Sequence, residues 1–372
     1  MCTFNNYIKI TFLILIWLAS LLIGSGIEYT YKTTEVIKLI TIFIFIFFAL
    51  PKQKGYLKIE RNTTISLLLL ILSFFLSAFI NVEYSSFFNY IWVFFLVMTI
   101  CNLNYTEKEL IVSGNIICTL GIYVLYDFTH YGIFAGWNSN SVAITGLYSY
   151  LMFMIPNFFD KKKKTKTYVY LVSMIYLYLL YNTDSRSSIL CVSLMLLSYL
   201  YKKKIYNLKN STIIFMLLFP MILSIVVVLI SNSGLYNMLD LWSRNTFNKP
   251  IFNGRNEIWQ YGMNSFFQYP LLGIGYINTG YWHNSAIACL VSYGFVGYTS
   301  WIIFFYHLIK CDNRERFNYN EFPIKLAFII IYLQQSVELG FFSQKPNLIP
   351  YFLLGLLLSK KRMNRRINRE KN

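Results

Sequence analysis

Long apolar stretches recur along the whole chain, separated by short polar connectors, and this alternation constrains the fold more than any other feature. Each stretch has about 15–25 residues, the length that an α-helix needs to cross the hydrocarbon core of a bilayer. Charged residues make up only 13% of the 372 residues, whereas a soluble domain carries about 25%. The pattern predicts an all-α, polytopic integral membrane protein.

We expect about twelve transmembrane helices in a single domain of residues 1–372. No internal repeat and no Gly/Ser-rich linker divides the chain. The first apolar run lacks a small-residue cleavage site and is long enough to span, so it should persist as a helix. The expected spans are residues 8–25, 35–50, 63–80, 87–101, 110–129, 140–159, 167–182, 186–201, 211–231, 284–309, 322–339 and 347–359.

Basic residues in the connectors orient these spans. They gather at 52–61, 161–166, 202–209 and 314–316 and in the C-terminal tail, and an even number of spans separates each group from the next. Cytoplasmic loops of membrane proteins collect lysine and arginine, so these groups and both termini are expected in the cytoplasm. The net charge of +17 then requires no nucleic-acid partner.

One connector on the opposite face is long. Residues 232–283, between the ninth and tenth expected spans, form an outward-facing loop that is nearly uncharged, and an active site is expected there. Within it, residues 256–269 carry apolar side chains at helical spacing, which is typical of a helix in the membrane interface. Gly273, Gly275 and Gly280 follow, but no strand precedes them, so they do not indicate a nucleotide-binding loop.

Two arginines lie where an anion could bind. Arg255 follows Gly254 at the start of the helical segment, where free helix N–H groups also favour an anion. The alternative for Arg255 is a side chain that reaches lipid phosphate. Arg186 lies in TDSRSS at the outer boundary of the eighth span, where an arginine is costly unless it pairs with an anion. Asp184 is one candidate for that anion, and a substrate phosphate is the other.

His283 and Asn284 open the tenth span. A histidine at a helix N-terminus lies at the positive end of the helix dipole, which favours the neutral imidazole. A neutral imidazole could accept a proton from a hydroxyl, and helix capping is the alternative role for the pair. Other outward-facing polar residues, which we assign to packing or capping, are Asn138 to Ser141, Gln334, Gln335 and Glu338.

Metal and nucleotide chemistry find no support in the sequence. The six cysteines are scattered without a C-x-x-C pair, and no D-x-D or Cys/His cluster faces outward. A metal-dependent transfer is therefore not expected. No Gly-rich P-loop occurs, so ATP is not expected to drive the process. We expect neither a metal nor another cofactor.

Three motifs follow one another at the outer ends of these spans. They are Ser185-Arg186 in TDSRSS, GRNEIW with Arg255 followed by YPLLGIG, and His283-Asn284 followed by SYGFVG. Asn140, in NSNS before the sixth span, lies in a further polar stretch. In order, spacing and membrane context, these motifs resemble the O-antigen ligase and polymerase superfamily of bacterial surface-glycan assembly, to which the Asn140 stretch is a looser match.

The resemblance implies a metal-independent glycosyltransferase of the bacterial cytoplasmic membrane, which uses polyprenyl-diphosphate-linked sugars at the outer face. By position, it implies that Arg186 and Arg255 bind the donor diphosphate and that His283 activates or orients the acceptor hydroxyl. Ser185, Asn284 and Asn140 would be further substrate-binding residues. Helix 256–269 would hold the polyprenyl chain.

The expected function is that of a polymerase of capsule or O-antigen repeat units, moving the growing glycan from undecaprenyl diphosphate onto a new lipid-linked unit. An O-antigen ligase with lipid A core as acceptor is the first alternative, and a flippase or exporter is the second. Mid-span positions are mostly apolar, which favours an enzyme over a transporter. Expected partners are undecaprenyl-diphosphate-linked oligosaccharide repeat units and membrane lipid, with a chain-length regulator and a flippase as candidates.

Overall fold

The computed structural model describes residues 2–24, 30–49, 61–158, 163–202, 209–247, 249–275, 282–310, 321–338, 340–341 and 347–370. Within these ranges the chain forms helices and no strands. The helices are α1 (Cys2–Gly24), α2 (Thr30–Ile44) with a π-helical continuation (Phe45–Ala49), α3 (Arg61–Ile80), α4 (Tyr84–Leu103), α5 (Glu107–His130), α6 (Ser139–Asn157), α7 (Lys163–Tyr181), α8 (Arg186–Leu200), α10 (Asn210–Ile230), α11 (Gly234–Phe247), α12 (Arg255–Gln268), α13 (Ser285–Ile309), α14 (Phe322–Gln334) and α15 (Leu348–Glu370).

Each of the twelve expected spans overlaps one of these helices. Among the described residues, five helices are both long and apolar enough to cross a membrane, namely α1, α3, α5, α10 and α13. The structure therefore confirms a helical membrane protein, while the count of twelve crossings stays a prediction. Gly280 and the basic connectors at 52–60, 161–162, 203–208 and 314–316 lie outside the described residues.

The eleventh expected span, 322–339, is longer than the helix observed there. α14 ends at Gln334, and the chain then turns tightly through short-range backbone bonds. The N–H of Ser336 donates to the carbonyl of Leu333, and that of Val337 donates to Gln334. Such i→i+3 bonds commonly close a helix end. The polar residues after Gln334 consequently lie in a turn rather than on a helix.

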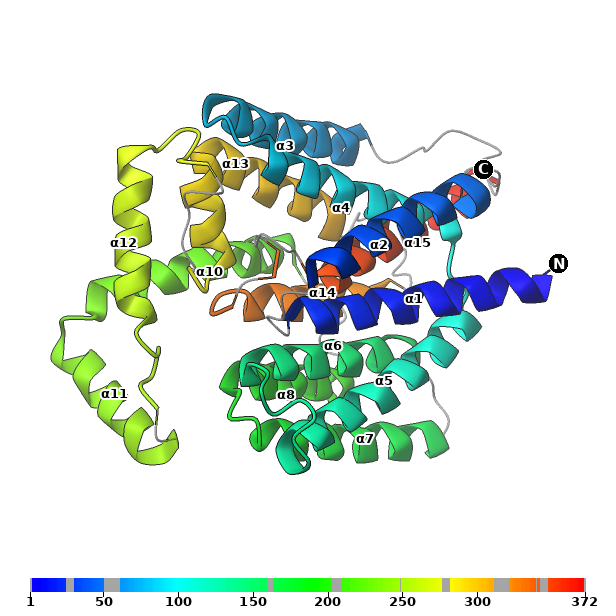
Figure 1. The fold of residues 1–372 in the computed structure, drawn as a ribbon, viewed down its shortest axis with the longest axis horizontal. Helices are drawn as coiled ribbons and strands as arrows, with labels where there is room; N and C mark the ends of the chain where they lie inside the picture. The colour runs from blue at the N-terminus through cyan, green and yellow to red at the C-terminus, as the bar shows by residue number, and fades with distance from the viewer. Residues whose placement is uncertain are drawn as a thin grey trace.

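The two ends of the bundle differ in what they carry. Figure 1 shows the start of α1 and the end of α15 at the right, and α11 and α12 at the left. α12 runs across the direction of α1 and α10. The placement of both termini at one end is what an even number of crossings requires. The expected outer loop thus contains α12, as the periodicity predicted, and also α11, which sequence analysis did not identify.

α13 is interrupted at Gly294, whose φ of 66° lies outside the helical region. The turn Pro270–Gly275 fits into this break and satisfies backbone groups that the break leaves free. The bonds are Ile274 N–H to Val291 O (2.9 Å), Gly275 N–H to Ser292 O (3.2 Å) and Phe295 N–H to Pro270 O (2.8 Å). A Cβ atom on Gly294 would collide with the backbone of Leu271, so both conformation and space require glycine there. The YPLLGIG and SYGFVG motifs form one structural unit that joins α12 to α13.

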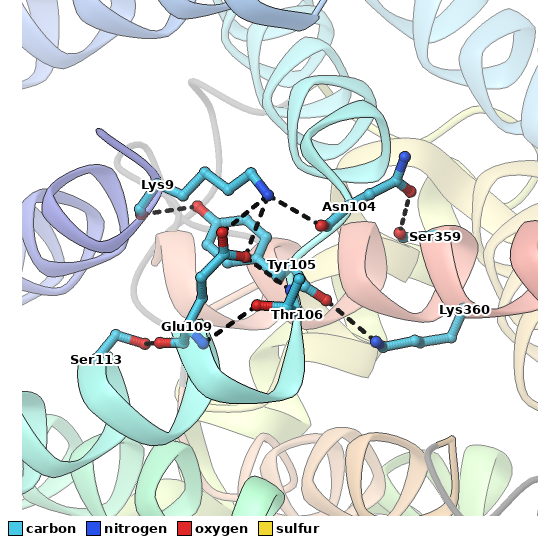
Figure 2. Close-up of polar contacts among 8 residues, drawn as sticks. All are labelled: Lys9, Asn104, Tyr105, Thr106, Glu109, Ser113, Ser359 and Lys360. Atoms are coloured by element: carbon cyan, nitrogen blue, oxygen red, sulfur yellow. Dashed lines mark hydrogen bonds and ion pairs between the residues drawn. The ribbon is translucent and has the colours of Figure 1, made fainter. Parts of the chain in front are cut away.

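A polar cluster closes the end of the bundle that holds the termini (Figure 2). Lys9 of α1 donates its three ammonium hydrogens to both carboxylate oxygens of Glu109 (3.0 and 3.1 Å) and to the carbonyl of Asn104 (3.1 Å). Thr106 and Glu109 form a capping box at the start of α5. Lys360 of α15 donates to the carbonyl of Tyr105 (3.1 Å). The cluster joins α1, α5 and α15, and the Lys9–Glu109 pair is buried.

Candidate functional site

A cavity of about 970 Å³ lies among α8, α10, α12 and the turn after α14. Its wall includes the first residues of α8 and α12, Arg186 and Arg255, together with Asn140 near the start of α6. Three residues that the sequence singled out, far apart along the chain, therefore meet in one wall. Among the charged groups of the lining, three cations face two carboxylates, so the net charge of the wall favours an anion.

Arg186 is held by groups of the α11–α12 connection. Its Nη1 donates to Ser243 Oγ (2.7 Å), and its Nη2 donates to the carbonyl of Pro250 (2.9 Å). Ser243 in turn donates to the carbonyl of Lys249 (2.8 Å). Asp184, the alternative partner for Arg186, forms an ion pair with Lys249 (3.3 Å). The guanidinium plane is thus fixed by a hydroxyl and a carbonyl, which add no negative charge.

Arg255 and His283 are connected through Glu338. Arg255 Nη2 donates to Glu338 Oε1 (2.8 Å), and His283 Nδ1 lies 3.7 Å from Glu338 Oε2. Glu338 is 6% exposed and lines the cavity from the turn after α14. Sequence analysis assigned Glu338 to packing or capping, whereas its place in the cavity wall makes it a further candidate for the site. The sequence did contain one indication: Glu338 is ionisable and lies at the end of an expected span, and such a residue indicates a functional site by default.

His283 lies beside the cavity wall, with its side chain 39% exposed. It precedes the N-cap of α13, as the sequence predicted, and it adopts a left-handed backbone conformation with φ 47°. A non-glycine residue keeps this conformation only where its surroundings impose it. Here the preceding carbonyl, that of Trp282, accepts a hydrogen bond from Trp259 Nε1 (2.7 Å), and the following residue is the buried cap Asn284. The imidazole is held between solvent and Glu338.

Asn284 is fully buried, and its side chain serves structure. Its Oδ1 accepts the N–H groups of Ala286 (2.8 Å) and Ile287 (3.2 Å). Its Nδ2 donates to the carbonyls of Pro220 (3.0 Å) and Ser336 (2.9 Å). Asn284 therefore ties α13 to α10 and to the turn that carries Glu338. This arrangement fits the capping alternative, and Asn284 acts on the site by holding this turn.

Ser185 is likewise buried, at 2% exposure. It occupies the N-cap position of α8, and its hydroxyl donates to Ser188 Oγ (3.1 Å). The residues that line the cavity include its neighbours Asp184, Arg186 and Ser187 but not Ser185 itself. Its position supports the start of the helix on which Arg186 lies. A direct contact of Ser185 with substrate stays a prediction.

The cavity continues as an apolar groove between α8 and α10. Its walls are Leu190, Leu194, Phe215, Phe219 and Leu223. Leu190 and Phe215 are largely exposed, so the groove is open sideways, toward the region that lipid would occupy. Among the described residues, α12 contributes only Arg255 to the lining. The buried residues of α12, Trp259 among them, belong to a helix that packs against α13 and α10. The apolar wall is therefore on α8 and α10, not on helix 256–269.

The segment that carries this geometry matches a known family. Residues 171–302, from α7 into α13, match the family model described as O-antigen ligase. The resemblance to the O-antigen ligase and polymerase superfamily is thereby confirmed. Arg186, Arg255 and His283 all lie in the matched segment, and Glu338 lies beyond it. The match supports a ligase- or polymerase-type function, that of a membrane glycosyltransferase. Among curated proteins, no match to this chain was found.

Proposed function

We propose that the protein polymerises a surface polysaccharide of the capsule or O-antigen type. It would transfer the growing glycan from undecaprenyl diphosphate onto the terminal sugar of a new lipid-linked repeat unit, at the outer face of the bacterial cytoplasmic membrane and without a metal ion. In this orientation the chain crosses the membrane twelve times, both termini are cytoplasmic, and residues 232–283 face outward. The observation that carries the proposal is the pairing of two arginines with an apolar groove in one cavity.

The two arginines fit the diphosphate of the donor. Each guanidinium presents several N–H groups in a planar fork, which can grip phosphate oxygens at two points. Arg186 is fixed from the side of α11 and Arg255 from Glu338, so both approach the cavity with defined orientation. During transfer, the bond between the anomeric carbon and the diphosphate oxygen breaks, and negative charge grows on the departing diphosphate. The arginines stabilise that charge, a type of contact typically worth about 2.7–4 kcal/mol.

The groove between α8 and α10 is the proposed binding site of the polyprenyl tail. It begins below Arg186 on the same helix and exposes Leu190 and Phe215 sideways. A lipid-linked donor could thus enter from the bilayer with its diphosphate at the arginines. Leu194→Gln should raise KM for a donor with a long prenyl chain and leave KM for a ten-carbon donor near that of the wild type. Equal KM changes for both donors would exclude the groove as the tail site.

His283 is proposed to receive the proton of the acceptor hydroxyl. The hydroxyl oxygen forms the new bond to the anomeric carbon, its proton passes to His283 Nε2, and the diphosphate leaves with the electron pair. Glu338 Oε2 faces Nδ1 at 3.7 Å, and a short approach would bring the two groups within hydrogen-bond distance. A carboxylate in that position orients the ring and stabilises its protonated form, as in other base–carboxylate pairs.

The test is ladder formation by purified protein from a lipid-linked repeat unit, without nucleotide and with a chelator. His283→Gln keeps hydrogen bonding but is not an effective base, so its rate should fall with that of His283→Ala by about 10²–10⁴-fold. His130→Gln is the matched control, because His130 stacks on Tyr126 at the exposed end of α5. Wild-type rates from His283→Gln would remove the base assignment. A strict metal requirement would overturn the metal-independent mechanism.

The family match itself favours a second candidate, transfer of a finished glycan to lipid A core, because the matching model is described as an O-antigen ligase. The two candidates share the donor site and differ in the acceptor. Offering purified protein both acceptors separates them: a polymerase extends the lipid-linked unit into a ladder, whereas a ligase transfers once to the core. Exclusive transfer to the core would replace the polymerase proposal.

A further inference from the structure

α11 has an exposed apolar face that the proposed reaction does not use. Leu235, Met238 and Leu241 are 53%, 61% and 60% exposed, and Trp242 on the same face is also largely exposed. With about 100° of rotation per residue, these four side chains fall within one arc of roughly 120° around the helix. A face of this width and composition is what an amphipathic helix presents to an apolar environment.

The other side of α11 is fixed to the protein. Ser243 is buried and accepts the hydrogen bond from Arg186. Asp240 Oδ1 accepts the N–H of Ile251 (2.8 Å), and the ring of Tyr236 stacks on Phe252 with centroids 6.4 Å apart. These contacts set the rotation of α11 about its own axis. The apolar arc therefore has a defined direction, away from the loop that contacts Arg186.

The position of α11 along the bundle brings this arc to a membrane boundary. α10 is long and apolar enough to cross a bilayer and ends at Ile230. α11 starts at Gly234, and the connecting residues can reach only about 10–14 Å. Figure 1 shows α11 leaving the left-hand end of α10 obliquely, below α12. A helix so close to the end of a span, with leucine, methionine and tryptophan on its exposed side, has the character of an interfacial helix.

We propose that α11 lies on the lipid bilayer with Leu235, Met238 and Leu241 inserted at the headgroup–acyl boundary, and that this contact holds Ser243 against Arg186. The partner is a lipid surface, and the inference does not depend on the transfer reaction. Two features favour lipid over a protein partner. The arc starts five residues after the end of a span, and the arc itself carries no charged side chain, since Asp240 and Arg244 pair with each other off it (2.6 Å).

Depth-dependent quenching tests the contact. In a background with the native cysteines replaced, Met238→Cys and Asn237→Cys carry an environment-sensitive fluorophore, in phosphatidylcholine vesicles containing brominated acyl chains. The two positions differ by 100° around the helix, and both are exposed. Quenching should be about threefold stronger or more at position 238 than at 237, because only the apolar arc enters the lipid. Weak, equal quenching at both positions would overturn the proposal and direct the search to a protein partner.

A second measurement covers the case in which labelled variants fail to fold. The triple variant Leu235→Gln/Met238→Gln/Leu241→Gln changes only exposed side chains and is compared with Asn237→Gln in lipid vesicles. Hydrogen exchange at residues 249–253 should become several-fold faster in the triple variant and stay unchanged in the control, since the lipid contact holds this loop through Ser243. Unchanged exchange in the triple variant would contradict the link to Arg186. Failure of the transfer reaction in wild-type protein would leave both measurements intact.

Discussion

Both ends of the bundle contain partly or fully buried charges, but their surroundings differ. One end has the ion pair Lys9–Glu109, and the other has Arg186 and Arg255. The ammonium group of Lys9 has three hydrogens and three oxygen acceptors at 3.0–3.1 Å, so the cluster in Figure 2 is complete in itself. Arg186 and Arg255 instead place two like charges in the wall of a cavity of about 970 Å³. The Lys9 cluster holds helices together, whereas the cavity wall with two arginines is suited to bind an anion.

The difference teaches that buried charge alone does not identify a site. Near the termini, Lys9 and Glu109 neutralise each other and the carbonyl of Asn104 accepts the remaining ammonium hydrogen, so this pair needs no ligand. In the cavity, Glu338 compensates Arg255, while Ser243 and Pro250 offer Arg186 a hydroxyl and a carbonyl, both neutral. A wall with one more cation than carboxylate, and an apolar groove beside it, suits a ligand that is anionic at one end and apolar at the other.

The largest effect is expected from breaking the closed cluster. Lys9→Met leaves Glu109 as an uncompensated buried carboxylate, which should destabilise the protein by about 3–5 kcal/mol. Thermal unfolding in lipid nanodiscs measures this loss, and the transfer rate per folded molecule should be unchanged. The double variant Lys9→Met/Glu109→Leu should recover most of the stability. Lost activity with unchanged stability would place function at this end of the molecule instead.

Removal of an arginine from the cavity should have the opposite effect: a large loss of activity and a small loss of stability. Arg186→Ala should slow ladder formation by about 10²–10³-fold with a smaller loss of stability, because the Ser243 hydroxyl and the Pro250 carbonyl that it leaves behind are neutral. Arg186→Lys and Arg255→Lys keep the charge but lose the planar fork, so they should rescue poorly. The control is Arg244→Ala, an exposed arginine of α11. Full polymer from either lysine variant would reduce these residues to generic positive charges.

A smaller effect on activity is expected when Arg186 is kept and only the residue that orients it is changed. Ser243→Ala removes the hydroxyl that accepts from Arg186 Nη1 at 2.7 Å, and a hydrogen bond to a charged group contributes about 1.5–3 kcal/mol. KM for the donor should rise roughly tenfold with little change in kcat, since the arginine is still present. Ser243→Thr keeps the hydroxyl and should stay near the wild type. A fall in kcat without a change in KM would contradict a positioning role.

The smallest effect concerns the ion pair between Asp240 and Arg244 on α11. The hydrogen bond from Arg244, and then that from the N–H of Ile251, lower the pKa of Asp240 below its ordinary value of 3.8. A carboxylate with a lowered pKa contributes stability above its unfolded-state pKa and loses it as pH falls through the folded-state pKa. Because Arg244 is largely exposed, Arg244→Gln should remove only a little of that stability at neutral pH and leave activity unchanged. Faster exchange of the Ile251 amide should appear in acid, below about pH 4. A large effect at neutral pH would show that Asp240 and Arg244 belong to the site.

The sequence predicted the helices well because each depends on its own apolar run. α10 covers 210–230 where 211–231 was expected, and α13 starts at Ser285 where 284 was expected. α14 ended early because a turn, not a further helical turn, follows Gln334. α11 was missed although Leu235, Met238, Leu241 and Trp242 have helical spacing, because a short amphipathic helix outside a span gives a weak signal.

The candidate site was predictable only in part. Arg186 and Arg255 were found because an arginine at a membrane boundary is costly and thus conspicuous. Glu338 was not singled out because its contacts with Arg255 and His283 join segments more than fifty residues apart. Ser185 and Asn284 carry the residue types of a binding site, but such residues also stand at helix N-termini, and the fold shows that Asn284 caps α13 with its side chain while Ser185 contacts Ser188. The groove could not be found from the sequence, since nothing local pairs α8 with α10.

The most direct test is the affinity of purified protein for a polyprenyl diphosphate and for the matching monophosphate, in the wild type and in Arg186→Lys and Arg255→Lys. Two forked guanidinium groups in one cavity should favour the diphosphate. We expect the wild type to bind the diphosphate more tightly, and each lysine variant to lose about tenfold or more for the diphosphate with little change for the monophosphate. Equal affinity of the wild type for both ligands, or undiminished diphosphate binding in both variants, would contradict the assignment of this cavity as the donor site.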